Sequence, residues 1–280
     1  MKILFVAEEK SDAEVINCLK KRLDGMGADT EAVGYGQMRF LKGRLKRTMY
    51  SAVVVFGIKS ASYLSRFRRN AGCKFLLVMI CRGYECEKGT ADSGCDLYVI
   101  PSDESMLGFV SDGIRENKLL PFGIPLDVSE DLDGDIRSRL GLSRDGTVIL
   151  YILSETPLKT VKKTLAASNA LFGKDCGHLV VCDNKRDEKR LASYFSPHKN
   201  IYVERLSEDA ELYMKCADIA FLNPDGVYMT LASRMSLPFV IIGGRKNECR
   251  GNALFFQKGG WPFSGKAFLT VCRTRTGFAG

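Results

Sequence analysis

The sequence lacks the features of several protein classes. Its 280 residues contain no apolar run near the roughly 20 residues that a membrane-spanning helix needs, and the longest such run covers only residues 75–81. The apolar stretch at residues 1–7 is short and is followed at once by Glu8, Glu9 and Lys10, unlike a signal peptide. We therefore expect a chain that stays in the cytoplasm.

Disulfide and metal-binding patterns are also missing. The ten cysteines include no C-x-x-C pair, and the only histidines are His178 and His198. Cys81, Cys86 and Cys95 form the tightest group, but they lack the short spacing and nearby histidine of most zinc sites. We expect reduced cysteines with a structural role and no metal, with a soft-metal site at this group as the less favoured alternative.

Glycine-rich phosphate loops are absent after the first strand of either half. The first of these turns, at residues 7–11, reads Ala-Glu-Glu-Lys-Ser, and the second, at 153–157, reads Leu-Ser-Glu-Thr-Pro. Without glycine the backbone cannot approach a phosphate closely, and the carboxylates repel it. We predict that neither turn cradles a phosphate.

Acidic residues are missing from residues 39–82, within a chain of formal net charge +8. The eleven basic residues of this segment are Arg39, Lys42, Arg44, Lys46, Arg47, Lys59, Arg66, Arg68, Arg69, Lys74 and Arg82. Interleaved apolar residues, namely Phe40, Leu41, Leu45, Met49 and Tyr50, favour a basic amphipathic helix over 38–50 that lies on an anionic membrane. A merely solvated basic face stays open as an alternative. Nucleic acid is not expected as a partner, because no binding motif or regular aromatic platform accompanies the charge.

The pattern of apolar runs predicts an α/β protein. Strands are expected at 2–7, 29–34, 52–57, 74–80 and 97–101, and then at 147–153, 178–182, 200–204, 218–222 and 238–242. Helices are expected after Ser11, which begins a capping box with Glu14, then over 38–50, after Ser102, and near 158–171, 186–195, 207–216 and 226–236. Such alternation is typical of parallel sheets with crossover helices.

The chain divides into two expected domains. Two prolines and a glycine interrupt the pattern at 120–126, and an acidic, polar stretch follows to residue 135. We therefore predict tandem Rossmann-like domains at 1–127 and 128–280, with a ligand cleft between the carboxyl ends of the two sheets. From about residue 259 the tail has no acidic residue and no helical repeat, so that a natural loose end and a shifted reading frame are both compatible with it.

One segment of the second domain suggests a binding site. A turn and a helix start, Asn223-Pro-Asp-Gly-Val-Tyr228, directly follow an expected strand, and the free N–H groups of a helix start suit a diphosphate. Glu248 and Asn252 follow the next strand, near the same sheet edge. On pattern alone, a plain turn with a helix cap is the favoured alternative.

The order of several motifs resembles a known family. The strings at 95–102 and 113–125, then Met214 to Asp218, Pro224-x-Gly226, Leu237-Pro238 and Asn252-Ala253 look like the monogalactosyldiacylglycerol synthase and processive diacylglycerol glucosyltransferase group. That group is related to the bacterial lipid-II-forming N-acetylglucosaminyltransferase. The resemblance covers about residues 90–258.

The resemblance implies a GT-B fold, in which two Rossmann-like domains face each other across a cleft. It implies hexose transfer from a UDP-sugar, as donor substrate without further cofactor or metal, to diacylglycerol or a polyprenyl carrier lipid at the inner face of a membrane. The N-terminal domain would serve the lipid acceptor, and the C-terminal domain would hold the nucleotide-sugar. The implied donor-binding residues are Asn223, Asp225, Gly226, Val227, Tyr228, Glu248 and Asn252.

The chain also departs from that group. Asp225 stands where the group has glycine, Leu231 stands where it has a ribose-binding glutamate, and its glycine-rich, histidine-containing loop after the first strand is absent, which leaves the catalytic base unassigned. We predict that the Asp225 carboxylate caps the following helix and repels a diphosphate, and that Asp225→Gly with Leu231→Glu strengthens UDP binding at least about tenfold. The alternative function is a catalytically degenerate GT-B relative that binds nucleotide-sugar or acts as an interaction protein at the membrane.

Overall fold

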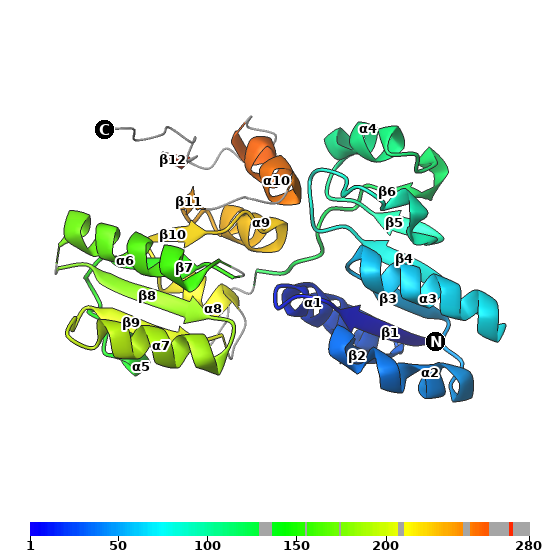
Figure 1. Cartoon of the computed structure of the whole chain (residues 1–280), viewed down its shortest axis with the longest axis horizontal. Coiled ribbons are helices and arrows are strands. Elements are labelled where there is room, and N and C mark those ends of the chain that lie inside the picture. The colour runs from blue at the N-terminus through cyan, green and yellow to red at the C-terminus, as the bar shows by residue number, and fades with distance from the viewer. Residues whose placement is uncertain are drawn as a thin grey trace. The chain divides into compact units, whose positions relative to one another are not determined.

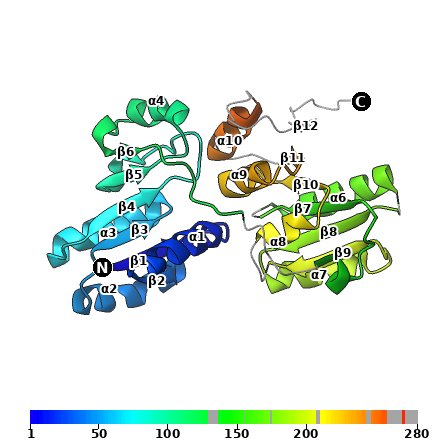
Figure 2. The ribbon, with the colours of Figure 1, turned by 180° about the vertical axis from the view of Figure 1, so that it is seen from behind.

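The chain forms two compact α/β units. A computed structural model describes residues 1–128, 136–154, 156–173, 175–206, 210–242 and 247–257, together with a two-residue strand at 269–270. The contacts divide the chain into Met1–Asp127 and Val128–Gly280, and each unit contains one parallel sheet with helices around it (Figure 1). Figure 2 shows the same two units from behind. The predicted fold class of two tandem Rossmann-like domains is therefore confirmed.

The sheet of the N-terminal unit has the strand order β2-β1-β3-β4-β5-β6, with every pair parallel. The strands are β1 (Lys2–Ala7), β2 (Asp29–Gly34), β3 (Ala52–Val55), β4 (Leu76–Ile80), β5 (Leu97–Val99) and β6 (Leu119–Leu120). Consecutive residues of β1 and β3 are buried, as expected for central strands of a parallel sheet that is covered on both faces. The apolar runs predicted these strands because they have no solvent-facing side.

The helices of this unit are α1 (Asp12–Gly25), α2 (Met38–Arg47), α3 (Ile58–Ala71) and α4 (Asp103–Ser111), with short 3-10 turns η1 (Tyr35–Gln37), η2 (Ala91–Ser93) and η3 (Glu116–Lys118). The sequence predicted α1, α2 and α4 but missed α3. The capping box at Ser11 was wrong, because the Ser11 side chain makes no capping hydrogen bond. Instead, Asp12 Oδ2 accepts the backbone N–H groups of Glu8 and Glu9 at 2.7 and 2.9 Å.

The sheet of the C-terminal unit has the order β12-β11-β10-β7-β8-β9. Its strands are β7 (Val148–Ile152), β8 (Gly177–Cys182), β9 (Ile201–Arg205), β10 (Ile219–Leu222), β11 (Phe239–Ile241) and β12 (Leu269–Thr270). Its helices are α5 (Ile136–Leu140), α6 (Leu158–Phe172), α7 (Lys185–Phe195), α8 (Ala210–Lys215), α9 (Gly226–Arg234) and α10 (Asn247–Gln257). The sequence missed α5 and α10, and apart from β12 the tail from residue 259 lies outside the described residues.

In each unit an aspartate beside one strand forms a hydrogen bond with the backbone of the neighbouring strand. Asp96 precedes β5, and its Oδ2 accepts the N–H of Leu77 at 2.8 Å while Arg68 pairs with the carboxylate. Asp218 precedes β10, and its Oδ2 accepts the N–H of Val148 at 2.7 Å. Arg137 forms an ion pair with the Asp218 carboxylate at 2.9 Å. Both aspartates belong to the motifs that carry the family resemblance. Since each lies at the amino end of its strand, they serve the register of the sheet rather than the carboxyl edge where ligands bind.

The basic segment at 39–82 differs from its prediction in two ways. The side chains of Leu41, Leu45 and Tyr50 are buried in the core of the N-terminal unit, so that they do not face a membrane. Phe40 and Met49 remain strongly exposed, at 83% and 89%. The charge is also partly neutralised by acidic residues from outside the segment, because Arg44 pairs with Glu31, Arg68 with Asp96, and Arg82 with Glu9. The Arg39 side chain lies outside the described part.

Among the described helices, none combines the length and the apolar content that crossing a bilayer demands.

Candidate functional site

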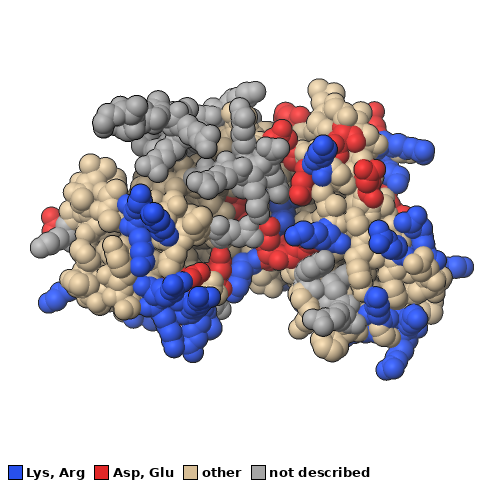
Figure 3. Space-filling model, viewed as in Figure 1, with Lys and Arg blue, Asp and Glu red and all other residues tan. Residues whose placement is uncertain are grey.

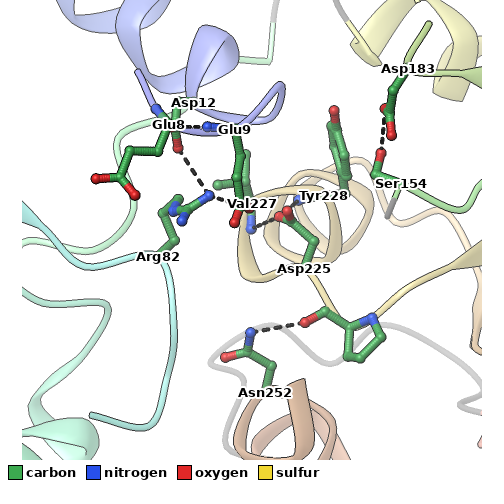
Figure 4. Close-up of polar contacts among 11 residues, drawn as sticks. Glu8, Glu9, Asp12, Arg82, Ser154, Asp183, Asp225, Val227, Tyr228 and Asn252 are labelled. Carbon is green, nitrogen blue, oxygen red and sulfur yellow. Dashed lines mark hydrogen bonds and ion pairs between the residues drawn. The ribbon is translucent and has the colours of Figure 1, made fainter. Parts of the chain in front are cut away.

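The carboxyl edge of the C-terminal sheet gathers polar side chains from three adjacent strands. Asp183 follows β8, Ser154 follows β7 and Asn223 follows β10, and these strands are neighbours in the sheet. Ser154 Oγ donates to Asp183 Oδ1 at 2.8 Å (Figure 4). The sequence analysis did not single out this pair, because its members lie 29 residues apart and only the parallel sheet brings them together.

Asp225 caps the helix that follows β10. Its backbone is extended, and its Oδ1 accepts the N–H of Val227 at 2.8 Å and the N–H of Tyr228 at 3.3 Å. Figure 4 shows the carboxylate turned toward these two nitrogens at the start of α9. The predicted cap is confirmed, since the orphan N–H groups of the helix start take an internal carboxylate as their acceptor.

Asn252 holds the turn that carries this cap. It lies on α10, is 3% exposed, and donates from Nδ2 to the carbonyl oxygen of Pro224 at 3.0 Å (Figure 4). Within the turn, the N–H of Asp225 donates to the Asn223 carbonyl at 2.7 Å. The N–H of Asn223 in turn donates to the carbonyl of Ile152, the last residue of β7, at 3.3 Å. The turn is thus fixed both to α10 and to the neighbouring strand.

The residues implied as donor-binding do not all present side chains to a ligand. Residues 226–232 of α9 are buried, and Val227 and Tyr228 are 0% exposed, so that these two offer only their backbone N–H groups. Leu231 is 1% exposed. A glutamate at that position would bury a carboxylate, and the predicted benefit of Leu231→Glu is therefore withdrawn. Glu248 lies in α10, but its side chain falls outside the described residues.

Asn223 is a half-buried polar residue at the start of the turn, directly after β10. Its Oδ1 atom is buried and has no hydrogen-bond partner within the described ranges. A buried amide oxygen without a partner costs free energy, and such groups concentrate at functional sites. The structure therefore brings Asn223, Asp225, Gly226 and Asn252 together around one turn.

The turn after β1 in the N-terminal unit carries a second cluster of charged residues. Arg82, in the loop after β4, pairs with Glu9 and lies 3.2 Å from Asp12 Oδ1 (Figure 4). Asp12 is fully buried. Burial raises the pKa of Asp12 to about 6, although Arg82 and the two backbone N–H groups that it accepts act to lower it. The sequence analysis missed the ion pair, because Arg82 and Glu9 lie 73 residues apart.

Glu8 of the same turn points to a different helix. Its carboxylate accepts the N–H of Ser60 at 2.8 Å, and also the Ser60 hydroxyl, at the start of α3. Gly57, the residue that precedes α3, leaves the space for this carboxylate, since a Cβ there would collide with it. The N–H of Ser60 at the start of α3 therefore donates to a carboxylate of the chain itself, as the N–H groups at the start of α9 do.

Two cysteines of the N-terminal unit have thiols of raised pKa. Burial raises the pKa of Cys86 to about 12 and that of Cys95 to about 11, so that both thiols stay protonated. Across the described ranges, no group of three or more His, Cys, Asp and Glu side chains is arranged to hold a metal ion.

No family model matches the chain. A processive diacylglycerol beta-glucosyltransferase of Staphylococcus saprophyticus is 23% identical over 195 residues, which make up 64% of this chain and 46% of that protein. The chain therefore spans about half the length of the curated relative that it matches.

Solved structures match over both units. A UDP-GlcNAc 2-epimerase of Neisseria meningitidis, bound to UDP-GlcNAc, is similar with a TM-score of 0.57 and 13% identity over 90% of this chain and 85% of that one. Acinetobacter baumannii MurG is similar with a TM-score of 0.55 and 13% identity over 92% and 83%. The chain has the GT-B fold. The fold expected from the family resemblance is therefore confirmed. The expected similarity to a diacylglycerol glucosyltransferase is confirmed as well.

The GT-B fold does not by itself name a reaction. The proteins similar to this chain include both a glucosyltransferase and an epimerase. Function depends on the site that a fold carries, and in this chain the candidate site is the turn at 223–226 with its cap.

Proposed function

We propose that this GT-B protein is glycosyltransferase-like and transfers a hexose from a UDP-sugar to a membrane lipid, either diacylglycerol or a polyprenyl carrier. The observation that carries the proposal is the turn at 223–226, which follows β10 and is fixed by the Asn252 contact with Pro224. It sets the N–H groups of Val227 and Tyr228 at a helix start, where a diphosphate is stabilised by the helix dipole. The name of the 23% identical relative supports a glucosyl group as the transferred hexose and diacylglycerol as the acceptor.

In this proposal the chain's own residues bind and orient the donor. Gly226, Val227 and Tyr228 contribute backbone N–H donors for the diphosphate, and Asn252 acts as a positioning residue through Pro224. The buried Oδ1 of Asn223 is an acceptor and would take a hydrogen bond from a hydroxyl of the donor. Hydrogen-bond donors fixed in this way stabilise the charge that develops on a departing diphosphate. Glu248 remains a proposed member of the site.

The N-terminal domain is proposed as the acceptor side, at the inner face of a membrane with anionic lipid. On and after α2, Phe40 and Met49 are exposed next to Lys46 and Arg47. Exposed apolar side chains beside basic ones suit the interface of an anionic bilayer. Because three arginines of 39–82 pair internally, this attraction is weaker than the composition alone implies.

Two observations favour a second candidate. Asp225 already satisfies the N–H groups that a diphosphate would need, and Leu231 is buried without a polar group for the ribose. A catalytically degenerate GT-B protein, which binds nucleotide-sugar weakly and acts as an interaction protein at the membrane, fits these two facts.

A transfer assay distinguishes the two candidates. The full chain is incubated with radiolabelled UDP-glucose or UDP-galactose and with vesicles that contain diacylglycerol or a polyprenyl phosphate, and labelled lipid is extracted. Labelled lipid that disappears in Asn252→Ala but persists in Asn184→Ala, which removes one side-chain-to-backbone hydrogen bond at the start of α7, supports transfer at this turn. UDP binding without labelled lipid supports the degenerate candidate. Absence of both transfer and UDP binding contradicts the placement of a donor at α9.

A further inference from the structure

A basic groove lies on the C-terminal domain between α6 and α7. It has a volume of about 380 Å³ and is lined by Leu158, Lys159, Lys162, Lys163, Ala166 and Tyr194. Both helices pack on the same face of the sheet, since Val161 and Leu165 of α6 share a core with Leu191 and Phe195 of α7. Figure 3 shows Lys and Arg side chains gathered over these two helices.

The described residues place no ion-pair partner beside the lysines of the groove. In the ranges that the structure describes, Lys159, Lys162 and Lys163 form no ion pair, and α6 contains no acidic residue. On α7, Arg186, Arg190 and Tyr194 follow at intervals of four residues, which places both arginines along the side of the helix that carries Tyr194. The acidic residues of α7, Asp187 and Glu188, lie in its first turn, and Asp187 accepts a hydrogen bond from Asn184.

The lining of the groove favours an acidic protein segment over a nucleic acid or an anionic membrane as its partner. Its lining includes the aliphatic Leu158 and Ala166, which suit an apolar side chain. Lys162 Nζ lies 3.7 Å from the centroid of the Tyr194 ring, and Phe195 meets that ring edge-on, so that the ring is poorly placed to stack on a nucleic-acid base. A bilayer surface is flat, whereas this groove lies between two helices.

We propose that the groove between α6 and α7 binds an acidic protein segment that carries an apolar anchor residue. The lysines of the groove and the arginines along α7 would steer and hold the carboxylates. The anchor would pack on Leu158, Ala166 and the part of the Tyr194 side chain that Lys162 leaves exposed. This surface is formed by α6 and α7 and does not include the turn at 223–226, so the proposal stands independently of hexose transfer.

The test uses the full chain and a fluorescein-labelled peptide of about ten residues, rich in Asp and Glu with two central leucines, followed by fluorescence anisotropy. Charge reversal in the groove, Lys159→Glu with Lys163→Glu, should weaken binding at least about fivefold. The matched control, Lys185→Glu with Lys189→Glu, makes the same change in net charge on the side of α7 away from Tyr194 and should weaken binding less than about twofold. Tyr194→Ser should weaken binding of the peptide with leucines but not of a version with serines in their place.

Three results would overturn the proposal. The first is an equal loss of binding in the groove and control variants, which would indicate attraction to net charge alone. The second is tighter binding of oligo-dT or of vesicles rich in phosphatidylglycerol than of the peptide, with sensitivity to the groove variant. The third is no peptide binding at low salt by a wild-type chain that is folded by circular dichroism.

Discussion

The Oδ1 atom of Asp225 lies 2.8 Å from the backbone nitrogen of Val227, where the first turn of α9 offers its free N–H groups. Under the proposed function, a diphosphate would be bound at this same helix start. Two unit charges about 5 Å apart at an effective dielectric of about 20 repel each other by about 3 kcal/mol, which corresponds to roughly a hundredfold in affinity. Asp225 therefore both completes the helix and opposes the donor.

Asn252→Ala should loosen the turn that carries this cap. The substitution removes the hydrogen bond to the Pro224 carbonyl and leaves a buried acceptor unsatisfied, at a cost of about 1–3 kcal/mol. Hydrogen exchange of the amides at 223–231 should accelerate, whereas Asn184→Ala, which removes a cap on α7, should leave them unchanged. Equal exchange in wild type and Asn252→Ala would show that α10 does not hold the turn.

Asp12 should make the N-terminal domain lose stability as the pH rises. Its pKa is about 6 in the folded chain against an ordinary value of 3.8, so the folded state binds the proton more tightly than the unfolded state. The resulting stabilisation is fully present below pH 3.8 and is lost as the pH rises to about 6, a change of about 3 kcal/mol. Urea unfolding of wild type and Asp12→Asn between pH 4 and 7 should show this loss in wild type alone. Parallel profiles would contradict it.

His178 should have the opposite effect in the C-terminal domain. It is fully buried next to Tyr151, with its Nδ1 at 2.8 Å from the phenolic oxygen, and burial lowers its pKa below the ordinary 6.5. The neutral ring is favoured in the fold, so that its contribution is present above pH 6.5 and is lost as the pH falls. The difference in unfolding free energy between wild type and His178→Asn should become smaller when the pH is lowered from about 7.5 to about 5. A constant difference would show that the ring does not titrate on unfolding.

Membrane attachment should depend on two exposed apolar side chains. Phe40→Ser with Met49→Ser should weaken co-sedimentation with anionic vesicles about tenfold, because both side chains are free to enter the interface. Leu107→Ser on α4, which removes another strongly exposed apolar residue, serves as the control. Binding should also fade at high salt. Equal binding of wild type to neutral vesicles, or equal loss in the control, would argue against α2 as the contact.

Local chemistry in the sequence predicted much of the fold and one feature of the site. The central strands are apolar on both faces, and Asp225 directly before Gly226 belongs to the residue types preferred as a helix N-cap. Both features depend only on neighbouring residues. The prediction of the Asp225 cap from the sequence was correct for this reason.

The remaining features depend on residues that are distant in the chain. Helix α3 follows Gly57 and takes its acceptor from Glu8, 52 residues before Ser60, so that no local capping signal precedes it. Arg82 was counted as a free surface charge, yet it is nearly buried and paired with Glu9 and Asp12. The apolar side of α2 was assigned to a membrane because amphipathic spacing does not distinguish a bilayer from the protein's own sheet.

Calorimetric titration of UDP into wild type and Asp225→Asn tests the central claim most directly. Asparagine caps a helix as well as aspartate does but carries no charge, so that the fold is kept and only the repulsion is removed. The account predicts weak UDP binding by wild type and an affinity at least about tenfold higher for the variant. Tight UDP binding by wild type, or no gain in a variant that is folded by circular dichroism, would show that the diphosphate is not bound at the start of α9.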